Sequence, residues 1–450
     1  MAQTVCVLGL GYIGLPTASV LANSGHRVIG VDTEASVVDA LNCGKTHLFE
    51  PGLKTLVAGA IGSGNLSARA TPTQADAFII SVPTPFGPGH APDMRHVREA
   101  IEAIVPVLRP GNLVVLESTS PPLTTRDLVA PLLATSGLEV GTDVFVAYCP
   151  ERVLPGRILK EIISNHRIIG GLDPRSAAMA RDLYASFVEG EIHVTDATTA
   201  EMVKLMENSF RDVNIALANE LARMAERVNI DAWEVVRLAN LHPRVNIHRP
   251  GPGVGGHCIS VDPWFLVDRF GPDAELLRTA REVNDRMPDH VVDIVLESLA
   301  GIDRPRVTAL GITYKANVDD LRESPAVEII RQLEAHGVEV RAYDPYVREW
   351  DPELFCIEAA FEGSDLAMLL VDHDEFRYLH PGALGDLMRR KAVFDARCRL
   401  DSMLWRSAGF DVRLLGRGPS RQQDDRAGKL TVVQLSLIPE PVASAREDEA

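Results

Sequence analysis

Near its amino terminus the chain reads Thr4-Val-Cys-Val-Leu-Gly9-Leu-Gly11-Tyr-Ile-Gly14-Leu-Pro16. The apolar residues before Gly9 predict a buried strand, and the apolar spacing over residues 15–24 predicts a helix that Gly25 closes. A second short apolar segment, at residues 27–32, ends in Asp32. Strand, glycine turn, helix and strand in this order predict a βαβ unit of a parallel sheet.

The glycine turn predicts a dinucleotide-binding site. Gly9 would make the tight turn, Gly11 would let the backbone approach a pyrophosphate, and Gly14 would let the helix pack closely on the strand. The helix amino terminus would then face the phosphates. Asp32 would accept a hydrogen bond from a ribose 2′-hydroxyl and repel a 2′-phosphate. The pattern favours NAD over NADP as the cofactor. The alternative to a dinucleotide site is that the glycines serve only the turn.

The alternation of strand and helix continues along the chain. Short apolar segments predict buried strands, and helical periodicity appears between them. Further strands are expected at residues 77–82, 113–117, 144–148 and 167–169, with a helix at 94–108. One long helix is expected over residues 198–228. Strands return at residues 307–312, 338–343, 366–371 and 392–395, with a helix at 325–336 that Ser324 would cap and Pro325 would open.

These elements predict an α/β fold with two Rossmann-like, doubly wound domains joined by a central helical segment that contains one long helix. We expect an NAD-binding domain, a central helical domain and a second α/β domain at residues 1–197, 198–300 and 301–418. Residues 419–450 are largely polar, and we expect a flexible tail in which residues 430–438 could dock.

Composition narrows the classes of function. The 450 residues carry a net charge of −17, which argues against nucleic acid or an acidic membrane as partner. No run of about 18 apolar residues predicts a membrane span, and the first residues do not resemble an export signal. The six cysteines are scattered without a C-x-x-C pair, so neither a disulfide framework nor a metal site is expected. We therefore expect a cytoplasmic protein.

The segment with the most unusual composition is Gly251-Pro-Gly-Val-Gly-Gly-His257-Cys258-Ile-Ser-Val-Asp262-Pro-Trp264. Glycines bring backbone close to a ligand and leave room for it. A helix that began near Ile259 would place Cys258 at its positive end, which lowers a thiol pKa, and would place Asp262 over the sulfur. A buried, inert cysteine is the alternative, and local sequence alone does not separate the two.

The expected long helix carries a polar stripe. At about 100° per residue, its members fall within an arc of about 100°. They are Glu201, Lys204, Asn208, Arg211, Asp212 and Asn219. Such a stripe faces water, a site or a partner network, and a structural network between helices is the alternative to a site.

Eight segments, in order over residues 4–400, together resemble the UDP-glucose/GDP-mannose dehydrogenase family. They are Leu8-Gly-Leu-Gly-Tyr-Ile-Gly-Leu-Pro16, Val82-Pro-Thr-Pro-Phe86, Glu117-Ser-Thr-Ser-Pro121, Tyr148-Cys-Pro-Glu-Arg-Val-Leu-Pro-Gly156, Glu207-Asn-Ser-Phe-Arg-Asp-Val-Asn214, His242-Pro-Arg-Val-Asn246, Gly253-Val-Gly-Gly-His-Cys-Ile259 and Asp319-Asp-Leu-Arg-Glu-Ser-Pro325. The segments around Arg152, His242 and Asp262, with Val371-Asp-His373, are most similar to the branch that oxidises UDP-N-acetyl-D-mannosamine.

The resemblance implies a four-electron oxidation of a sugar C6 alcohol with two NAD molecules used in sequence. Cys258 would attack the C6 aldehyde, and the thiohemiacetal would be oxidised to a thioester that water releases. Lys204 and Asn208 would stabilise the oxyanion. Asp262 and Glu151 would move protons and activate water.

The resemblance also implies the binding residues. Cofactor contacts are expected from Gly9, Gly11, Tyr12, Ile13, Gly14, Asp32, Val82, Thr84, Thr119 and Arg322. UDP-sugar contacts are expected from Arg152, Val153, Leu154, Lys204, Asn208, Arg211, Arg244, Gly255 and Lys315. Lys315 and Arg322 would bind the UDP phosphates or the second face of the cofactor. Arg244 would act in the neighbouring subunit of a homodimer or higher oligomer.

The chain departs from the family pattern at Pro122-Leu123, where a small residue or glycine is usual, at Ala316 and at the strand ending in Asp395. Three other functions stay open. The first is a sister dehydrogenase acting on UDP-glucose, UDP-N-acetylglucosamine or UDP-N-acetylgalactosamine. The others are a non-catalytic sensor of NAD or UDP-sugar, and a two-electron dehydrogenase of the 3-hydroxyacyl or 6-phosphogluconate kind.

Overall fold

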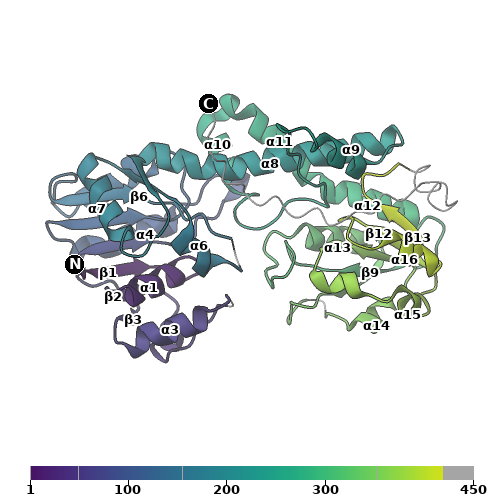
Figure 1. Ribbon diagram of the computed structural model, residues 1–450, viewed down its shortest axis with the longest axis horizontal. Helices are drawn as coiled ribbons and strands as arrows, with labels where there is room; N and C mark the ends of the chain where they lie inside the picture. The colour runs from purple at the N-terminus through teal and green to yellow at the C-terminus, as the bar shows by residue number, and fades with distance from the viewer. Residues whose placement is uncertain (1, 49, 155, 352, 419–450) are drawn as a thin grey trace.

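The computed structural model describes residues 2–48, 50–154, 156–351 and 353–418. Two α/β units lie side by side, and one long helix runs along both of them (Figure 1). The tail expected at residues 419–450, with its docking segment at 430–438, lies outside the described residues.

The first unit is built on an eight-stranded sheet in the order β3-β2-β1-β4-β5-β6-β7-β8. Its strands are β1 (Thr4–Leu8), β2 (Arg27–Val31), β3 (Leu66–Arg69), β4 (Ala77–Ile80), β5 (Asn112–Leu116), β6 (Val144–Tyr148), β7 (Arg167–Gly171) and β8 (Ile192–Asp196). Neighbouring strands are parallel except β6 and β7. Strand order reverses between β1 and β4, which creates the crevice where ligands bind in such sheets.

Helices cover both faces of this sheet, and an apolar core lies on each face. The helices are α1 (Gly14–Asn23), α2 (Ala35–Asn42), α3 (Leu53–Gly62), α4 (Arg95–Ile104), α5 (Ala130–Ala134), α6 (Ile158–Ser164) and α7 (Pro174–Tyr184), with short turns η1 (Pro88–His90), η2 (Val105–Val107) and η3 (Thr125–Val129). The helix expected over residues 94–108 is shorter, because the chain changes to the 3₁₀ turn η2 beside Pro106.

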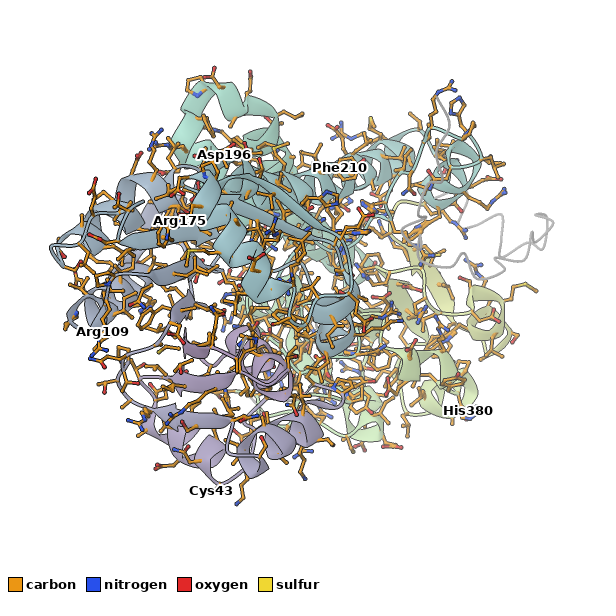
Figure 2. The ribbon with its side chains drawn as sticks, turned by 60° about the vertical axis from the view of Figure 1, so that its left-hand side comes forward. Cys43, Arg109, Arg175, Asp196, Phe210 and His380 are labelled. Atoms are coloured by element: carbon orange, nitrogen blue, oxygen red, sulfur yellow. The ribbon has the colours of Figure 1, made fainter. Side chains whose placement is uncertain are left out.

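The long helix α8 (Ala197–Arg227) confirms the prediction over residues 198–228. Asp196 caps it, since its carboxylate accepts a hydrogen bond from the Thr199 N–H at 2.9 Å (Asp196 is labelled in Figure 2). Four further helices follow in the central part. They are α9 (Ala232–Ala239), α10 (Asp262–Phe270), α11 (Glu275–Asp285) and α12 (Met287–Ser298), with the turn η4 (Gly271–Ala274) between α10 and α11.

The second unit has five parallel strands in the order β10-β9-β11-β12-β13. They are β9 (Arg306–Leu310), β10 (Glu339–Tyr343), β11 (Leu366–Leu369), β12 (Ala392–Asp395) and β13 (Asp411–Leu414), accompanied by α13 (Pro325–Ala335), α14 (Ile357–Phe361), η5 (Asp374–Tyr378), α15 (Pro381–Gly385) and α16 (Ser402–Ser407). The apolar face of α12 belongs to the core of this sheet.

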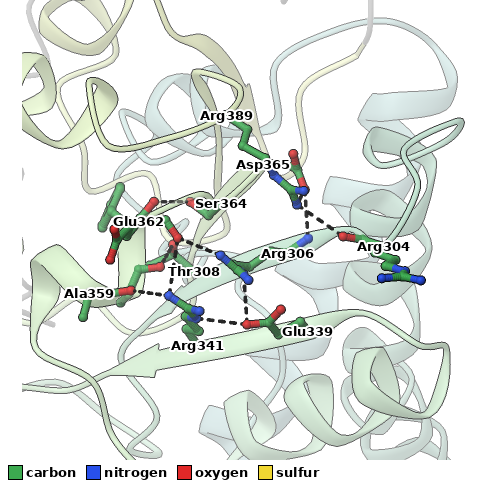
Figure 3. Close-up of polar contacts among 12 residues, drawn as sticks. Arg304, Arg306, Thr308, Glu339, Arg341, Ala359, Glu362, Ser364, Asp365 and Arg389 are labelled. Atoms are coloured by element: carbon green, nitrogen blue, oxygen red, sulfur yellow. Dashed lines mark hydrogen bonds and ion pairs between the residues drawn. The ribbon is translucent and has the colours of Figure 1, made fainter.

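Ionic contacts fix the amino ends of β9 and β10 (Figure 3). The guanidinium groups of Arg306 and Arg341 each lie within 3.0 Å of the Glu339 carboxylate. The Arg306 N–H donates to Asp365 at 2.9 Å, and Arg389 pairs with the same carboxylate. This network stabilises the end of the sheet at which the strands begin. Parallel sheets bind ligands at the other end, where the strands have their carboxyl ends.

Candidate active site

The turn between β1 and α1 has the shape that a dinucleotide requires. Gly9 has φ 86°, and a Cβ on it would lie 2.4 Å from the Ser81 carbonyl oxygen. A Cβ on Gly14 would lie 1.9 Å from the Gly9 carbonyl oxygen. A Cβ on Gly11 would meet no described atom within 4 Å. Two positions therefore accept only glycine, and the third leaves open space where a pyrophosphate can approach the backbone.

Asp32 lies directly beside this turn. Its Oδ2 accepts a hydrogen bond from the Leu10 N–H at 2.9 Å, and its Oδ1 accepts one from the Glu34 N–H at 3.0 Å. Each oxygen keeps a second lone pair, so the carboxylate can still accept from ribose hydroxyls. These residues fit the adenosine half of NAD.

Asp32→Asn is expected to reduce the preference for NAD over NADP by about 10-fold or more, because it removes the charge that repels a 2′-phosphate. Asparagine keeps one acceptor for the turn, so the fold should persist. The measurement is kcat/KM for both cofactors in both proteins. A wild-type enzyme that already uses NADP as well as NAD would contradict the role given to Asp32.

The other expected cofactor contacts lie on loops around this turn. Val82 follows β4, and its N–H donates to the Ser118 hydroxyl at 2.9 Å. Thr84 and Thr119 are partly exposed on the loops after β4 and β5. Arg322 comes from the second unit, and its guanidinium carbon lies 6.0 Å from the ring centroid of Tyr12. The second unit therefore reaches the cofactor turn.

Cys258 lies in a turn directly before α10. Its carbonyl oxygen accepts hydrogen bonds from the N–H groups of Val261, at 3.1 Å, and Asp262, at 2.8 Å. The helix expected near Ile259 begins instead at Asp262, with Pro263 in its first turn. Proline suits that position because its missing N–H would have no partner there. Cys258 therefore lies outside the helix, where the helix dipole acts on it more weakly.

The pKa of the Cys258 thiol is raised, so the expectation of a lowered pKa is wrong for this arrangement. The side chain is exposed at the surface, yet protein surrounds it closely enough that lost hydration raises its pKa. The Asp262 carboxylate raises it further. Three cations act in the opposite direction, and they are Lys204, Arg322 and Lys315.

Asp262 is the buried acid beside the thiol. Its side chain is 2% exposed, and the Asn208 amide donates to its Oδ2 at 2.5 Å. Burial raises the pKa of Asp262 to about 6, while Lys204 and the Asn208 hydrogen bond act in the opposite direction. A carboxylate with this pKa is suited to accept a proton near neutral pH.

Lys204 is held by the backbone of Glu151. Its Nζ donates to the Glu151 carbonyl oxygen at 2.8 Å. The Glu151 carboxylate points elsewhere and forms a buried ion pair with Arg167 at 2.7 Å. The structure thus brings Cys258, Asp262 and Lys204 together, while Glu151 presents a carbonyl to this group and its carboxylate to Arg167.

The polar stripe of α8 divides between the site and a structural network. Asp212 pairs with Arg281 of α11 at 2.6 Å, and both side chains are buried. The Asn219 amide donates to Asn284 at 2.8 Å. Glu201 is also buried and bonded to the loop before α5. A helix network therefore accounts for Asp212 and Asn219, and Glu201 holds a loop, whereas Lys204 and Asn208 face the cysteine segment.

The segment expected to hold the sugar makes several contacts within the protein. The Arg152 guanidinium donates to Glu207 at 2.9 Å and to the His166 carbonyl at 3.0 Å. Val153 packs against the core of the first unit. The remaining expected sugar contacts in this part of the chain, Leu154, Arg211 and Arg244, are exposed.

The glycine run brings the cysteine segment against the second unit. A Cβ on Gly255 would lie 2.1 Å from the Glu323 carbonyl oxygen, and one on Gly256 would lie 2.6 Å from the Tyr314 ring. These glycines allow close approach to neighbouring protein, whereas we expected approach to a ligand. Ser324 precedes α13 as expected, but its hydroxyl donates to the Ile312 carbonyl at 2.7 Å and does not cap the helix.

A small pocket lies at the carboxyl ends of β9 and β11. Lys315 lines it, as expected for a residue that binds a nucleotide phosphate. The other lining residues are Pro252, Gly253, Thr313, Tyr314, Pro325, Ala326, Leu370, Val371 and Arg397. Within the described chain, this pocket lies on the same side of the second sheet as the glycine run.

Sequence reasoning missed the buried charges behind Glu151. Arg167 is 2% exposed, and Glu117 is 3% exposed and accepts a hydrogen bond from the Tyr184 hydroxyl at 2.7 Å. Burial and, to a smaller extent, the Glu151 charge raise the pKa of Glu117 to about 7. The available signal was an arginine that opens an otherwise apolar strand, since buried charges are rarely unpaired.

Three features lie close together. They are the dinucleotide turn, Cys258 from the central segment, and the pocket on the second sheet that Lys315 lines. This arrangement defines an NAD-dependent dehydrogenase whose substrate carries a nucleotide.

Comparison with known proteins makes the class specific. The NAD binding, central and UDP binding domains of the UDP-glucose/GDP-mannose dehydrogenase family match residues 3–188, 198–286 and 308–402. The chain is 48% identical to a UDP-N-acetyl-D-mannosamine dehydrogenase of Methanococcus maripaludis, over 92% of this chain and 97% of the relative. It is 47% identical to an NDP-N-acetyl-D-galactosaminuronic acid dehydrogenase of Ralstonia solanacearum, over 88% and 96%.

A solved structure agrees with these sequence matches. The UDP-D-ManNAc dehydrogenase of Pyrococcus horikoshii superposes with a TM-score of 0.87 at 43% identity, covering 92% of this chain and 99% of that one. The chain belongs to the UDP-glucose/GDP-mannose dehydrogenase family and is an NAD-dependent nucleotide-sugar dehydrogenase. No helix in the described part of the chain is both long and apolar enough to cross a membrane.

Proposed function

We propose that the chain oxidises UDP-N-acetyl-D-mannosamine at C6 to UDP-N-acetyl-D-mannosaminuronate and uses two NAD molecules per sugar. The observation that carries the chemistry is the meeting of Cys258, Asp262, Asn208 and Lys204, which come from two separate segments. The choice of sugar is supported by relatives of that name at 43–48% identity, which extend over most of the chain.

In the proposed reaction the C6 alcohol first loses a hydride, and a proton that passes to solvent, to give an aldehyde. Asp262 takes the Cys258 proton, and the sulfur forms a bond to C6 while the carbonyl π electrons move to oxygen. Lys204 and Asn208 stabilise that oxyanion. Loss of a second hydride from the thiohemiacetal gives a thioester, and attack by water breaks the C–S bond and returns the thiolate. NAD, when bound, accepts the hydride in each oxidation.

Asp262 is the better placed of the two acids expected to move protons. It lies close enough to the thiol for its charge to raise the thiol pKa. The Glu151 carboxylate is committed to Arg167, so in this proposal Glu151 anchors Lys204 through its carbonyl oxygen. Activation of the hydrolytic water falls to Asp262 after it has given up the thiol proton.

The test is NADH release across a panel of UDP-N-acetylmannosamine, UDP-N-acetylgalactosamine, UDP-N-acetylglucosamine and UDP-glucose. We expect two NADH per UDP-N-acetylmannosamine and a kcat/KM about 10-fold or more above the other sugars. Preference for another sugar would support a sister dehydrogenase. UDP-N-acetylgalactosamine belongs in the panel because one relative is named an NDP-N-acetyl-D-galactosaminuronic acid dehydrogenase. One NADH per sugar would support a two-electron enzyme, and binding without turnover would support a sensor.

We propose that two copies pair along α8. Its large apolar side chains that remain exposed in the single chain include Met206, Phe210, Leu217 and Met224, and the exposed Val228 directly follows the helix (Phe210 is labelled in Figure 2). At about 100° per residue they fall within an arc of about 40°, opposite Lys204 and Asn208. A continuous apolar stripe of this length marks an interface, and a symmetric pair would present each helix to its twin.

Arg244→Ala is expected to lower turnover about 10-fold or more without unfolding the protein, because Arg244 is exposed and would contact the sugar bound by the neighbouring copy. Mixing Arg244→Ala with Cys258→Ser subunits should restore part of the activity, since some mixed dimers hold one intact composite site. No recovery between subunits that have exchanged would place Arg244 within its own chain or outside the site.

We also propose the division into NAD-binding, central and UDP-sugar-binding domains at residues 1–197, 198–300 and 301–418. The two sheets and the helices from α8 to α11 support it, while α12, just before the second boundary, packs on the second sheet. A reducing cytoplasm is the proposed compartment, and the six cysteines, all free, support it.

A further inference from the structure

A strained residue lies on the loop that follows β5. Leu123 has φ 77°, in the left-handed region where a side chain crowds its own backbone. Among the described non-glycine residues with positive φ, Leu123 is the one with a purely hydrocarbon side chain, which offers no polar contact in compensation. The turn that follows, η3, is a π-helix, a form common near functional sites. Strain of this kind persists only where surrounding contacts enforce it.

The Leu123 carbonyl accepts a backbone hydrogen bond from the Asp127 N–H at 2.7 Å, and the side-chain contacts that hold this turn come from one carboxylate. The Leu123 N–H donates to Oε2 of Glu201 at 2.6 Å. The N–H and the hydroxyl of Thr125 donate to Oε1 of Glu201, at 2.7 Å and 2.6 Å. Glu201 is fully buried, and both of its oxygens are used. Burial raises the pKa of Glu201 to about 7, and the three donors act in the opposite direction by favouring the ionised carboxylate. Hydrogen bonds to that ionised form are charge-assisted, and they can hold a residue in a conformation that it would otherwise avoid.

Glu201 lies on the face of α8 that carries the site. At about 100° per residue it falls within about 60° of Lys204 and Asn208. The buried Tyr148 lies near both Glu201 and Asp262. Burial raises the pKa of its hydroxyl, and the charges of these two carboxylates act in the same direction. The strained loop is therefore bonded to the same helix face that supplies Lys204 and Asn208.

The loop carries Thr119 between two anchors. At its start the Ser118 hydroxyl donates to the Val82 carbonyl at 2.7 Å, which ties the loop to the strand end beside the cofactor turn. At its end Glu201 holds Leu123 and the residue two positions further on. The position of Thr119 relative to α8 depends on the second anchor.

We propose that Glu201 is a positioning residue, which holds Leu123 in its left-handed conformation and so fixes the loop of Thr119 against the Lys204 and Asn208 face of α8. The inference rests on the proposed function, in which α8 supplies the oxyanion contacts, and on the expected contact of Thr119 with the cofactor. The competing explanation is that Glu201 only caps the start of η3. A cap would affect stability but would not make activity depend on the conformation of Leu123.

The test is a cycle of Glu201→Gln, Leu123→Gly and the double variant, with kcat measured at saturating NAD and UDP-sugar. Glutamine keeps the shape and can accept from Thr125, but its NH₂ group faces the Leu123 N–H. We expect Glu201→Gln to lower kcat about 10-fold or more with KM for UDP-sugar within about 2-fold. The isotope effect with C6-deuterated sugar should rise, because hydride transfer becomes slower than the other steps.

The double variant provides the decisive measurement. Glycine adopts positive φ without strain, so in this variant the loop no longer needs all three hydrogen bonds to Glu201. Leu123→Gly alone should stay within about 2-fold of wild type, and the double variant should regain kcat to within about 3-fold. Glu220→Gln, exposed on α8, and Arg304→Gly, which replaces an exposed residue of φ 50° before β9, should leave kcat unchanged.

Two results would overturn the proposal. One is a Glu201→Gln variant with wild-type kcat and isotope effect. The other is a loss of kcat that Leu123→Gly does not relieve, because the strain at Leu123 would then be unrelated to Glu201. Wild-type enzyme is measured alongside, so failure of the wild type to oxidise any UDP-sugar would refute the proposed function, whereas an active wild type isolates the role of Glu201.

Discussion

Cys258→Ser is expected to bind NAD and UDP-sugar but to form the acid on the order of 10³-fold more slowly than wild type. A hydroxyl is a far weaker nucleophile than a thiolate near neutral pH. The surroundings of Cys258 strengthen this contrast, because Lys204, Arg322 and Lys315 favour the thiolate and Asp262 can accept the proton. None of these contacts would bring a serine hydroxyl into its ionised form at neutral pH.

The product ratio separates this mechanism from its competitors. Cys258→Ser should stop after the first oxidation, giving at most one NADH per sugar and traces of free aldehyde. Cys43→Ser, which changes an exposed cysteine at the carboxyl end of α2, serves as the control and should behave as wild type. Steady-state acid production near the wild-type rate in Cys258→Ser would exclude a covalent intermediate.

The interior of each sheet could be predicted because buried parallel strands are continuous apolar runs. The strands at residues 144–148 and 392–395 match β6 and β12 at both ends. The three strands that the sequence did not reveal, β3, β8 and β13, lie at sheet edges. An edge strand is partly exposed, so its residues alternate or are polar, and β8 reads Ile-His-Val-Thr-Asp.

The site could be predicted where the chemistry depends on local sequence. The glycine turn and Asp32 needed only one βαβ unit, and the structure gives each of them a steric or hydrogen-bonding reason. The pKa of Cys258 could not be predicted, because it depends on where α10 begins and on how closely the second unit surrounds the thiol. Both are properties of tertiary packing.

The polar stripe of α8 shows the limit of pattern reasoning most clearly. Its members share one face of the helix, as helical spacing requires, yet they serve different purposes. Asp212 is neutralised by Arg281, a residue 69 positions further along the chain. Lys204 instead donates to the carbonyl oxygen of Glu151, on the loop that follows β6. Periodicity identifies the face, whereas the identity of each partner depends on which distant element packs there. The family could be recognised because its motifs occur together and in order along the chain, and the comparisons confirm it.

Asp262→Asn is expected to lower kcat/KM by about 10²–10³-fold, because it removes the base that takes the Cys258 proton. The pH profile gives the specific signature. Burial raises the pKa of Asp262 to about 6, so the wild-type base is protonated below that pH and ionised above it. Activity should therefore rise as pH increases through about 6, and Asp262→Asn should lack this rise. Asp268→Asn, an exposed change on α10, should keep the wild-type profile.

The same substitution should move stability in the opposite direction. A carboxyl whose pKa is raised from 3.8 to about 6 favours the folded state fully below pH 3.8, and this contribution is lost as pH rises through 6. This increase in the pKa corresponds to about 3 kcal/mol in the free energy of unfolding. Asparagine carries no charge to desolvate, so Asp262→Asn should unfold at a higher temperature than wild type at pH 8, and the difference should shrink towards pH 4. A variant that is less active and also less stable at pH 8 would show that Asp262 serves packing, because a buried catalytic base is costly to the fold in its working, ionised form.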